Sequence, residues 1–351
     1  MEQKKFDPDA VGVNNGSFFG MPFSRNDARL VLIPVPWDVT VSYGAGTVRG
    51  PEAVIEASTQ LDFFDPIAEG AWQRGIATLP LSHELAAKSE LYRRTAERVI
   101  DHLEAGGRET DSVVVEGTRA VNEACRAMNQ WVENEVERLL QEDKLVGLVG
   151  GDHSTPYGLI RALGRHHEAF GILHIDAHRD LRNVYEGFEF SHASIMYNVL
   201  RDVPQVERLV QVAVRDFCQQ EADLARTDAR IVSYTDLDLS EAEFSGTTWD
   251  KVCRKIVESL PRKVYVSFDI DGLSPDNCPH TGTPVSGGLS FNQAVWLLKT
   301  VVESERTIIG FDVVEVSPAA GDEDRIDAIA GARILWKLAS LSLKADAALN
   351  R

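Results

Sequence analysis

Eight short apolar runs recur along the chain, and they limit the folds that it can adopt. They are residues 29–35, 75–79, 145–150, 171–176, 207–214, 230–234, 263–269 and 307–313. Most are continuously apolar, which is typical of strands that are covered on both faces. Helical periodicity separates them over 119–142, 156–165, 192–200, 247–260, 291–303 and 325–345. This alternation predicts an α/β protein of three layers, with helices on both faces of a largely parallel sheet of about eight strands.

The whole chain, residues 1–351, is predicted to form a single domain, because no repeat, low-complexity tract or linker divides it. Residues 1–28 precede the first predicted strand and are interpreted as an N-terminal extension. Residues 80–118 separate the second and third strands and include the polar stretch EAGGRETDS (104–112). We interpret them as an extra helix or an excursion loop.

The chain is strongly acidic, with a formal net charge of −18. Such a surface repels nucleic acid and anionic membranes and suits cationic ligands or metals, although solubility alone also explains it. No apolar run approaches the ~20 residues of a membrane span, and the N-terminus lacks the apolar core of a secretion signal. The four cysteines contain no CxxC pair, so neither a disulfide framework nor a zinc site is predicted. We therefore expect a cytoplasmic protein that binds neither nucleic acid nor membrane.

Carboxylates and imidazoles gather where three of the predicted strands end. Asp152 and His153 follow the third strand; Asp176, His178 and Asp180 follow the fourth; Asp269 and Asp271 follow the seventh. Residues two apart point to the same side of an extended chain, so each of the last two groups can converge. Open parallel sheets bind ligands at the carboxyl ends of their strands. Burying unpartnered carboxylates costs several kcal/mol, so we expect a cation to neutralise them.

Six of these residues form a ligand set that is rich in oxygen, contains nitrogen and lacks thiolate. They are His153, Asp176, His178, Asp180, Asp269 and Asp271. The set favours Mn²⁺, with Fe, Co, Ni or Zn as competitors, and it is too large for one tetrahedral ion. A pair of ions about 3.5–4 Å apart, bridged by carboxylates, would use all six ligands. We therefore predict a pair of Mn²⁺ ions per chain, with Ni²⁺ or another divalent ion as the alternative.

Longer motifs surround these residues. They are GGDHS (150–154), DAHRD (176–180), SFDIDGLSP (267–275), TGTPVSGG (281–288) and FDVVEVSP (311–318), with YGAGTVRGPEAVIEAS (43–58) upstream. Together they resemble the ureohydrolase family, which includes arginase and agmatinase, over nearly the whole chain. The resemblance implies an arginase-like α/β/α fold, a binuclear manganese centre and hydrolysis of a guanidino group with release of urea. It also implies a homo-oligomer, usually a trimer or a hexamer.

The resemblance further implies roles for individual residues. All six predicted ligands match metal ligands of the family, with Asp176 and Asp269 as the bridging carboxylates. Glu315, in VEVSP, matches the carboxylate that pairs with the guanidinium group. His192, in SHAS, matches a mobile acid/base histidine. Asp180 is placed to pass a proton to the leaving amine, which is the usual task of a general acid/base residue.

The substrate is predicted to be a small cationic guanidino compound, with agmatine first. DAHRDLR followed by YEGFEFSHAS resembles agmatinase-type members, and Arg182 stands where arginases have an Asn that reads the α-amino acid. We count Arg182 and Thr283 with Glu315 and His192 among the substrate-binding residues. Arg182 could form an ion pair at the surface or clamp a substrate carboxylate. If it points into the pocket, a guanidino acid such as guanidinobutyrate would be preferred.

Several alternatives stay open at this point. Guanidine, another guanidino acid or formiminoglutamate could be the substrate, and a degenerate metal-binding subunit is the non-enzymatic alternative. The complete set of six ligands argues against the degenerate subunit. Four residues depart from the family's pattern, namely Arg179, Ser274, Cys278 and His280. His174, two residues before Asp176, is expected to be an ordinary core residue.

Overall fold

The centre of the protein is a sheet of eight parallel strands in the order β2-β1-β3-β8-β7-β4-β5-β6. The computed structural model describes residues 6–319 and 325–349, so the first five residues of the predicted N-terminal extension lie outside it. The strands are β1 (Leu30–Val35), β2 (Ile76–Thr78), β3 (Leu145–Gly150), β4 (Phe170–Ile175), β5 (Val206–Val212), β6 (Ile231–Tyr234), β7 (Lys263–Asp269) and β8 (Thr307–Val314). Each predicted apolar run forms one strand, and the predicted parallel sheet is confirmed.

Ten α-helices and five short 3-10 helices are found in the described part of the chain. The α-helices are α1 (Gly50–Ser58), α2 (His83–Glu104), α3 (Ser112–Gln141), α4 (Tyr157–His166), α5 (Ile195–Asp202), α6 (Gln219–Thr227), α7 (Asp236–Phe244), α8 (Trp249–Glu258), α9 (Phe291–Glu303) and α10 (Ile326–Leu349). The 3-10 helices are η1 (Phe18–Gly20), η2 (Thr47–Arg49), η3 (Ala71–Arg74), η4 (His192–Ser194) and η5 (Ile270–Gly272).

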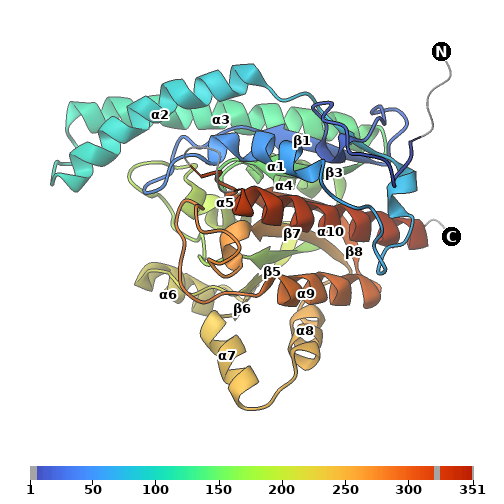
Figure 1. The fold of residues 1–351 in the computed structure, drawn as a ribbon. Helices are drawn as coiled ribbons and strands as arrows, with labels where there is room; N and C mark the ends of the chain where they lie inside the picture. The colour runs from blue at the N-terminus through green and yellow to red at the C-terminus, as the bar shows by residue number, and fades with distance from the viewer. Residues whose placement is uncertain (1–5, 320–324, 350–351) are drawn as a thin grey trace.

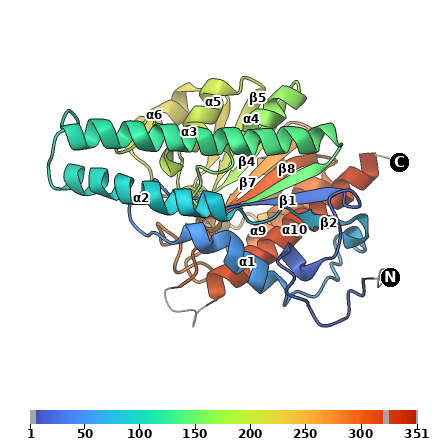
Figure 2. The ribbon, with the colours of Figure 1, turned by 90° about the horizontal axis from the view of Figure 1, so that it is seen from above.

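Two hydrophobic cores lie on opposite faces of the sheet. Successive side chains of a strand point to opposite faces. In β1, accordingly, Leu30 and Leu32 join one core while Val31 and Ile33 join the other. Helices α1, α8, α9 and α10 cover the first core, and α2 to α5 cover the second, as Figures 1 and 2 show. The predicted three-layer α/β/α architecture is therefore confirmed.

Helices α2 and α3 pack against each other as a long hairpin whose far end projects beyond the rest of the protein (Figure 1). Residues 80–118 hold all of α2 and the start of α3. The sequence periodicity begins at residue 119 because the first turn of α3 exposes Val113 and Val115 to solvent. None of the described helices, including these two, combines the length and apolar character needed to cross a membrane.

Helices α6 and α7 were not predicted from the sequence. Their sequences, QQEADLART and DLDLSEAEF, are largely polar, and only Leu239 of α7 and Glu221 and Ala222 of α6 are buried. Periodicity detects a helix by its apolar face, so helices that bury so little leave almost no such signal.

Candidate metal centre

The four central strands of the sheet carry the candidate site at their carboxyl ends. In the order β3-β8-β7-β4 these strands are neighbours, although they lie far apart in the sequence. His153 follows β3, Glu315 follows β8, Asp269 ends β7 and Asp176 follows β4. The topology therefore assembles side chains from four distant segments at one edge of the sheet, where parallel sheets bind their ligands.

A first cluster surrounds the imidazole of His153. Its Nδ1 lies 2.9 Å from Asp176 Oδ2, 3.1 Å from Asp180 Oδ2 and 3.1 Å from Asp269 Oδ2. This buried Nδ1 forms no hydrogen bond with the described residues, whereas Nε2 lies 2.9 Å from the Ser267 hydroxyl. A histidine that ligates metal is typically held in this way, with one nitrogen fixed by a hydrogen bond and the other turned to the ion. The arrangement fits a cation among the three carboxylates.

A second cluster surrounds His178 and shares a carboxylate with the first. His178 Nδ1 lies 3.1 Å from Asp271 Oδ2 and 3.4 Å from Asp176 Oδ1. Asp176 thus directs one oxygen to each histidine. Asp269 directs Oδ2 to His153 and accepts the Asp271 amide on Oδ1 at 2.8 Å. The structure therefore brings all six predicted ligands together, with Asp176 between the two clusters.

The site is crowded with negative charge. Burial, followed by the nearby Asp271 and Asp176, raises the pKa of Asp269 well above its usual value. Burial and Asp176 likewise raise the pKa of Asp180 to about 6. Burial alone would lower the pKa of His153, but the surrounding carboxylates of Asp176, Asp180 and Asp269 outweigh it and raise that pKa well above normal. Carboxylates this close keep their charge only beside cations, so the oxygen and nitrogen donors fit a pair of divalent ions.

Two of the predicted catalytic residues have backbone torsions that residues other than glycine rarely adopt. Asp180 has φ 55° and Glu315 has φ 60°. Such left-handed torsions cost energy in residues other than glycine and gather at functional sites. Glu315 accepts the His153 amide on Oε1 at 2.8 Å, and its carbonyl accepts the Thr281 hydroxyl at 2.8 Å. Among the residues that the structure describes, no group donates to its Oε2.

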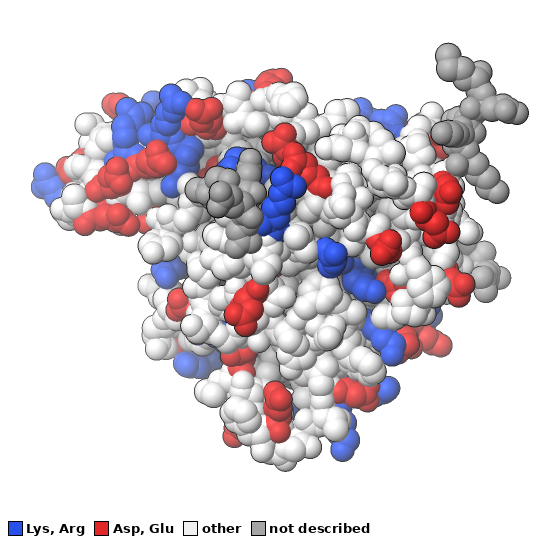
Figure 3. All heavy atoms as spheres, viewed as in Figure 1, with Lys and Arg blue, Asp and Glu red and all other residues white. Residues whose placement is uncertain are grey.

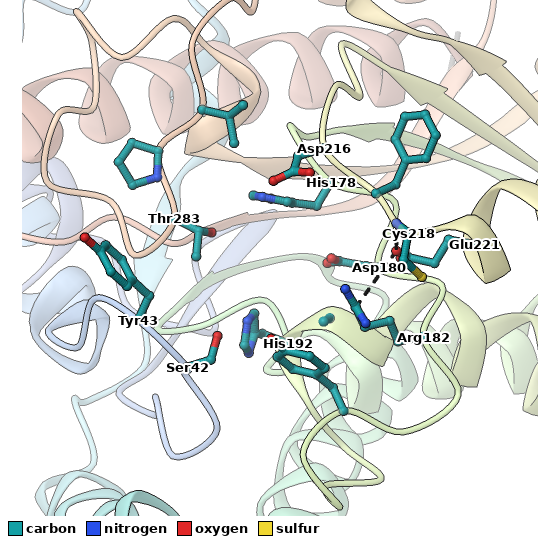
Figure 4. A pocket seen from close by; sticks show the side chains of 15 residues that line it. Ser42, Tyr43, His178, Asp180, Arg182, His192, Asp216, Cys218, Glu221 and Thr283 are labelled. Carbon is teal, nitrogen blue, oxygen red and sulfur yellow. Dashed lines mark hydrogen bonds and ion pairs between the residues drawn. The ribbon is translucent and has the colours of Figure 1, made fainter. Parts of the chain in front are cut away.

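A cavity of about 620 Å³ opens over the clusters (Figure 4). His178, Asp180, Arg182, His192 and Thr283 line it, so five of the predicted site residues face one space. The remaining predicted ligands and Glu315 are buried below its wall.

His192 lies at the start of η4, on the cavity wall. Its amide donates to Thr40 Oγ1 at 3.3 Å, and its Nδ1 lies 3.4 Å from the Ser191 hydroxyl. Burial, followed by the charge of His178, lowers the pKa of His192 to about 3. The imidazole of His192 is therefore neutral at neutral pH.

The cavity wall also carries charged residues that the sequence analysis did not identify. Arg182 Nε lies 3.9 Å from Glu221 Oε2, and the guanidinium stacks over the Tyr185 ring at 4.5 Å. Glu221 is buried and also accepts the Leu181 amide at 3.0 Å. Asp216 is exposed and forms no ion pair with the described residues. Asp216 and Glu221 follow β5, so their position after a predicted strand was the sequence signal that marked them.

His174 does more than fill the core. It is fully buried, as expected, but its Nε2 lies 2.8 Å from Asp176 Oδ2. Its Nδ1 accepts from Gln211 Nε2 at 3.1 Å, and Arg179 donates to Gln211 Oε1 at 3.0 Å. His174 lies two residues before Asp176, as His178 lies two residues after it. The two-residue spacing in the sequence therefore already indicated that His174 faces the same side as Asp176. Arg179, one of the departures, does not line the cavity itself, but its guanidinium lies 4.1 Å from the centre of the Phe217 ring, which does.

The other three departures hold the loop that follows β7. The Ser274 amide donates to Leu289 O at 2.8 Å, and the Cys278 thiol donates to Ile270 O at 3.2 Å. His280 Nδ1 lies 2.8 Å from Asp327 Oδ2 at the start of α10. None of these three is on the cavity wall, so their departures from the pattern concern the loop and not the surface that meets a substrate.

Comparisons with known proteins agree with this geometry. A model of the arginase family matches residues 28–340. N(1)-aminopropylagmatine ureohydrolase of a Thermus thermophilus strain is 34% identical over 298 residues, which cover 83% of this chain and 84% of the relative. Agmatinase of Klebsiella pneumoniae strain MGH 78578 is 29% identical over 319 residues, covering 91% and 88%. The crystal structure of a hypothetical agmatinase from Burkholderia thailandensis has the same fold, with a TM-score of 0.72, 24% identity and 97% and 94% coverage.

Proposed function

The chain belongs to the arginase family of ureohydrolases, which hydrolyse linear amidines, and from that premise we propose that it releases urea from a small cationic guanidino compound such as agmatine. The observation that carries this proposal is the pair of carboxylate clusters around His153 and His178, at the floor of the cavity. We extend the proposal to a homo-oligomer, a trimer or a hexamer, on the family resemblance alone.

The proposed cofactor is a pair of Mn²⁺ ions, with Ni²⁺ as the alternative. His153, Asp180, His178 and Asp271 would each bind one ion, and Asp176 and Asp269 would bind both. Two such ions, when bound, supply a water-derived nucleophile at neutral pH and polarise the carbon under attack. The oxygen-rich donor set and the free Nδ1 of His153 support this assignment.

The chain's own residues would bind and orient the substrate and move its protons. Glu315 Oε2 is available to accept a guanidinium N–H, and a charge-assisted bond of this kind fixes the planar cation. Expulsion of the amine from the tetrahedral intermediate requires a proton. Asp180 lines the cavity and can hold that proton, and the imidazole of His192 on the same wall can relay it to the departing nitrogen.

The charges on the cavity wall favour an amine at the far end of the substrate. The buried Glu221 already balances Arg182, whereas Asp216 has no cationic partner among the described residues. A carboxylate without a partner attracts a cationic group. The cavity of about 620 Å³ is of the size that holds drug-like ligands, so it also has room for a substrate longer than agmatine. The relatives named for agmatine and for N(1)-aminopropylagmatine fit both features.

Agmatine is expected to exceed arginine as a substrate by at least ~100-fold in kcat/KM. Arginine would bring an α-carboxylate into a cavity where Glu221 already pairs with Arg182, and desolvating a charge without a partner is costly. The measurement is urea release by the Mn²⁺-loaded protein with agmatine, N(1)-aminopropylagmatine and arginine. Efficient turnover of arginine would refute the proposed substrate class.

A guanidino acid is the second candidate substrate, because Arg182 lines the cavity and its side chain is 37% exposed. The ion pair with Glu221 spans 3.9 Å, which is long enough for a substrate carboxylate to compete for the guanidinium group.

Two matched substitutions distinguish the candidates. With an amine at the far end of the substrate, Asp216→Asn should lower kcat/KM for agmatine about 10-fold and leave guanidinobutyrate unaffected, since one charge contact is lost. With a guanidino acid, Arg182→Ala should lower kcat/KM for guanidinobutyrate by a similar factor and spare agmatine. The measurement is kcat/KM for agmatine and for guanidinobutyrate with each of the two variants. If Arg182→Ala lowers kcat/KM for guanidinobutyrate alone and Asp216→Asn has no effect, the substrate is a guanidino acid and not a compound with an amine at its far end.

A further inference from the structure

The α2–α3 hairpin contacts the two loops that form the cavity wall. The first loop, residues 39–43, contributes Ser42 and Tyr43 to the wall. The second, residues 182–192, contributes Arg182, Tyr185 and His192. The hairpin itself contributes no residue to the cavity, but it contacts both of these loops.

Arg93 of α2 holds the first loop. Its side chain is only 14% exposed, and its Nη1 donates to Val39 O at 3.4 Å and also to Val41 O. Glu97, one turn further along α2, accepts from its Nε at 3.1 Å. A mostly buried guanidinium that bonds two carbonyls restrains the backbone between them. The residue between those carbonyls is Thr40.

Thr40 connects the restrained loop to the proposed proton carrier. It is fully buried, and its Oγ1 accepts the His192 amide at 3.3 Å. The same hydroxyl lies 3.4 Å from Asp152 Oδ2, to which it donates. A displacement of the backbone at Thr40 therefore moves the amide partner of His192.

Helix α3 holds the second loop. Asn122 donates from Nδ2 to Gly187 O at 3.2 Å and accepts the Glu189 amide on Oδ1 at 2.8 Å. Gly187 has φ 83°, and a Cβ there would lie 2.5 Å from the Thr118 methyl group, so the turn packs directly on the helix. Arg126 adds an ion pair with Glu189 at 3.1 Å.

We propose that the α2–α3 hairpin braces the two loops of the cavity wall. In this proposal Arg93 is a positioning residue: it fixes the backbone at Thr40, and Thr40 in turn fixes the position of His192. The expected effect on catalysis rests on the proposed function, because it takes His192 to be the proton carrier. The solvent face of the hairpin takes no part in the brace. Positive and negative side chains mix at its projecting end (Figure 3). Arg94, which is exposed in the middle of α2, pairs with Glu90 of the same helix.

Arg93→Ala is expected to lower kcat about 100-fold, since a displacement of ~1 Å at a reacting group has an effect of that order. KM should change less than about threefold, and the metal content should stay at the wild-type level. Arg94→Ala, the neighbouring arginine on the solvent face, is the matched control and should behave as wild type. Unchanged kcat in Arg93→Ala would overturn the proposal.

A double-mutant cycle with His192→Asn tests whether Arg93 acts through His192. If it does, the double variant should be no slower than His192→Asn alone, because groups that act as one unit are non-additive. Losses that multiply would show that Arg93 acts by another route. Should Arg93→Ala fail to fold, Thr40→Val against Thr40→Ser tests the same step. The serine variant keeps the hydroxyl and should retain kcat, and a serine variant as slow as the valine variant would also overturn the proposal.

Amide hydrogen exchange tests the bracing role of the hairpin independently of the proposed enzymatic activity. In Arg93→Ala, amides of residues 39–43 and 185–192 should exchange faster, with exchange in the sheet unchanged. If amide exchange in both loops is unchanged in Arg93→Ala, the proposed bracing role is wrong, even if the enzyme is active. If the wild type hydrolyses no guanidino compound while this exchange pattern holds, the proposed function fails and the brace stands.

Discussion

Replacing Asp176 with alanine is expected to remove both metal ions and, with them, the activity. One oxygen of Asp176 faces His153 at 2.9 Å and the other faces His178 at 3.4 Å, so a single substitution weakens both clusters. Metal ions contribute several kcal/mol to catalysis of this kind, which corresponds to a loss of at least ~10³-fold in kcat/KM. Elemental analysis after dialysis, with a urea assay on the same sample, makes the measurement. Asp269→Ala should give the same result.

Two other predicted ligands serve as controls for this result. Of the two cluster histidines, the Asp180 carboxylate faces His153 and the Asp271 carboxylate faces His178. Asp180→Ala and Asp271→Ala should therefore each retain about one ion of the two. Full metal occupancy in both Asp176→Ala and Asp269→Ala would show that these carboxylates do not hold the metals.

His192→Asn is expected to keep both ions and lose turnover. His192 lies on the cavity wall and is absent from both carboxylate clusters, and a proton-transfer role is worth ~10²–10⁴ in rate. The prediction requires kcat and metal content to be measured on one preparation. His167→Asn, at the opposite edge of the sheet, is the control and should change neither. Loss of metal from His192→Asn would make His192 a ligand and not an acid/base residue.

The sequence predicted the sheet, and it predicted which carboxylates and imidazoles the structure brings together, because both depend on short-range periodicity. A buried parallel strand is a continuous apolar run, and ligands two residues apart share one side of the chain that follows it. Asp176 and His178 satisfy this rule, and the structure places them together. His174 satisfies it too, but a histidine inside an apolar run was interpreted as core, and its contact with Asp176 was missed.

The pairing of charges on the cavity wall could not be predicted in the same way. The charge of this wall depends on which loops the sheet order brings together, and Asp216 and Arg182 come from loops after two different strands. The left-handed torsions of Asp180 and Glu315 are likewise invisible in the sequence, because nothing in the residue type requires them. The ion pair with Glu221 determines whether the charge of Arg182 is available to a substrate. The distance between these two side chains is known only from the folded structure.

The order of the strands determines when during synthesis the metal site can be completed. β3 and β4 follow each other along the chain, yet β8 and β7 lie between them in the sheet. A nascent chain that ends before Lys263 already has His153 and Asp176, but it lacks the strand that brings Asp269. Parallel pairing between segments this far apart forms slowly, since long loops must close before any contact is made. We therefore expect the proposed metal ions to bind late in the biogenesis of this protein, after the last two strands have inserted into the middle of the sheet.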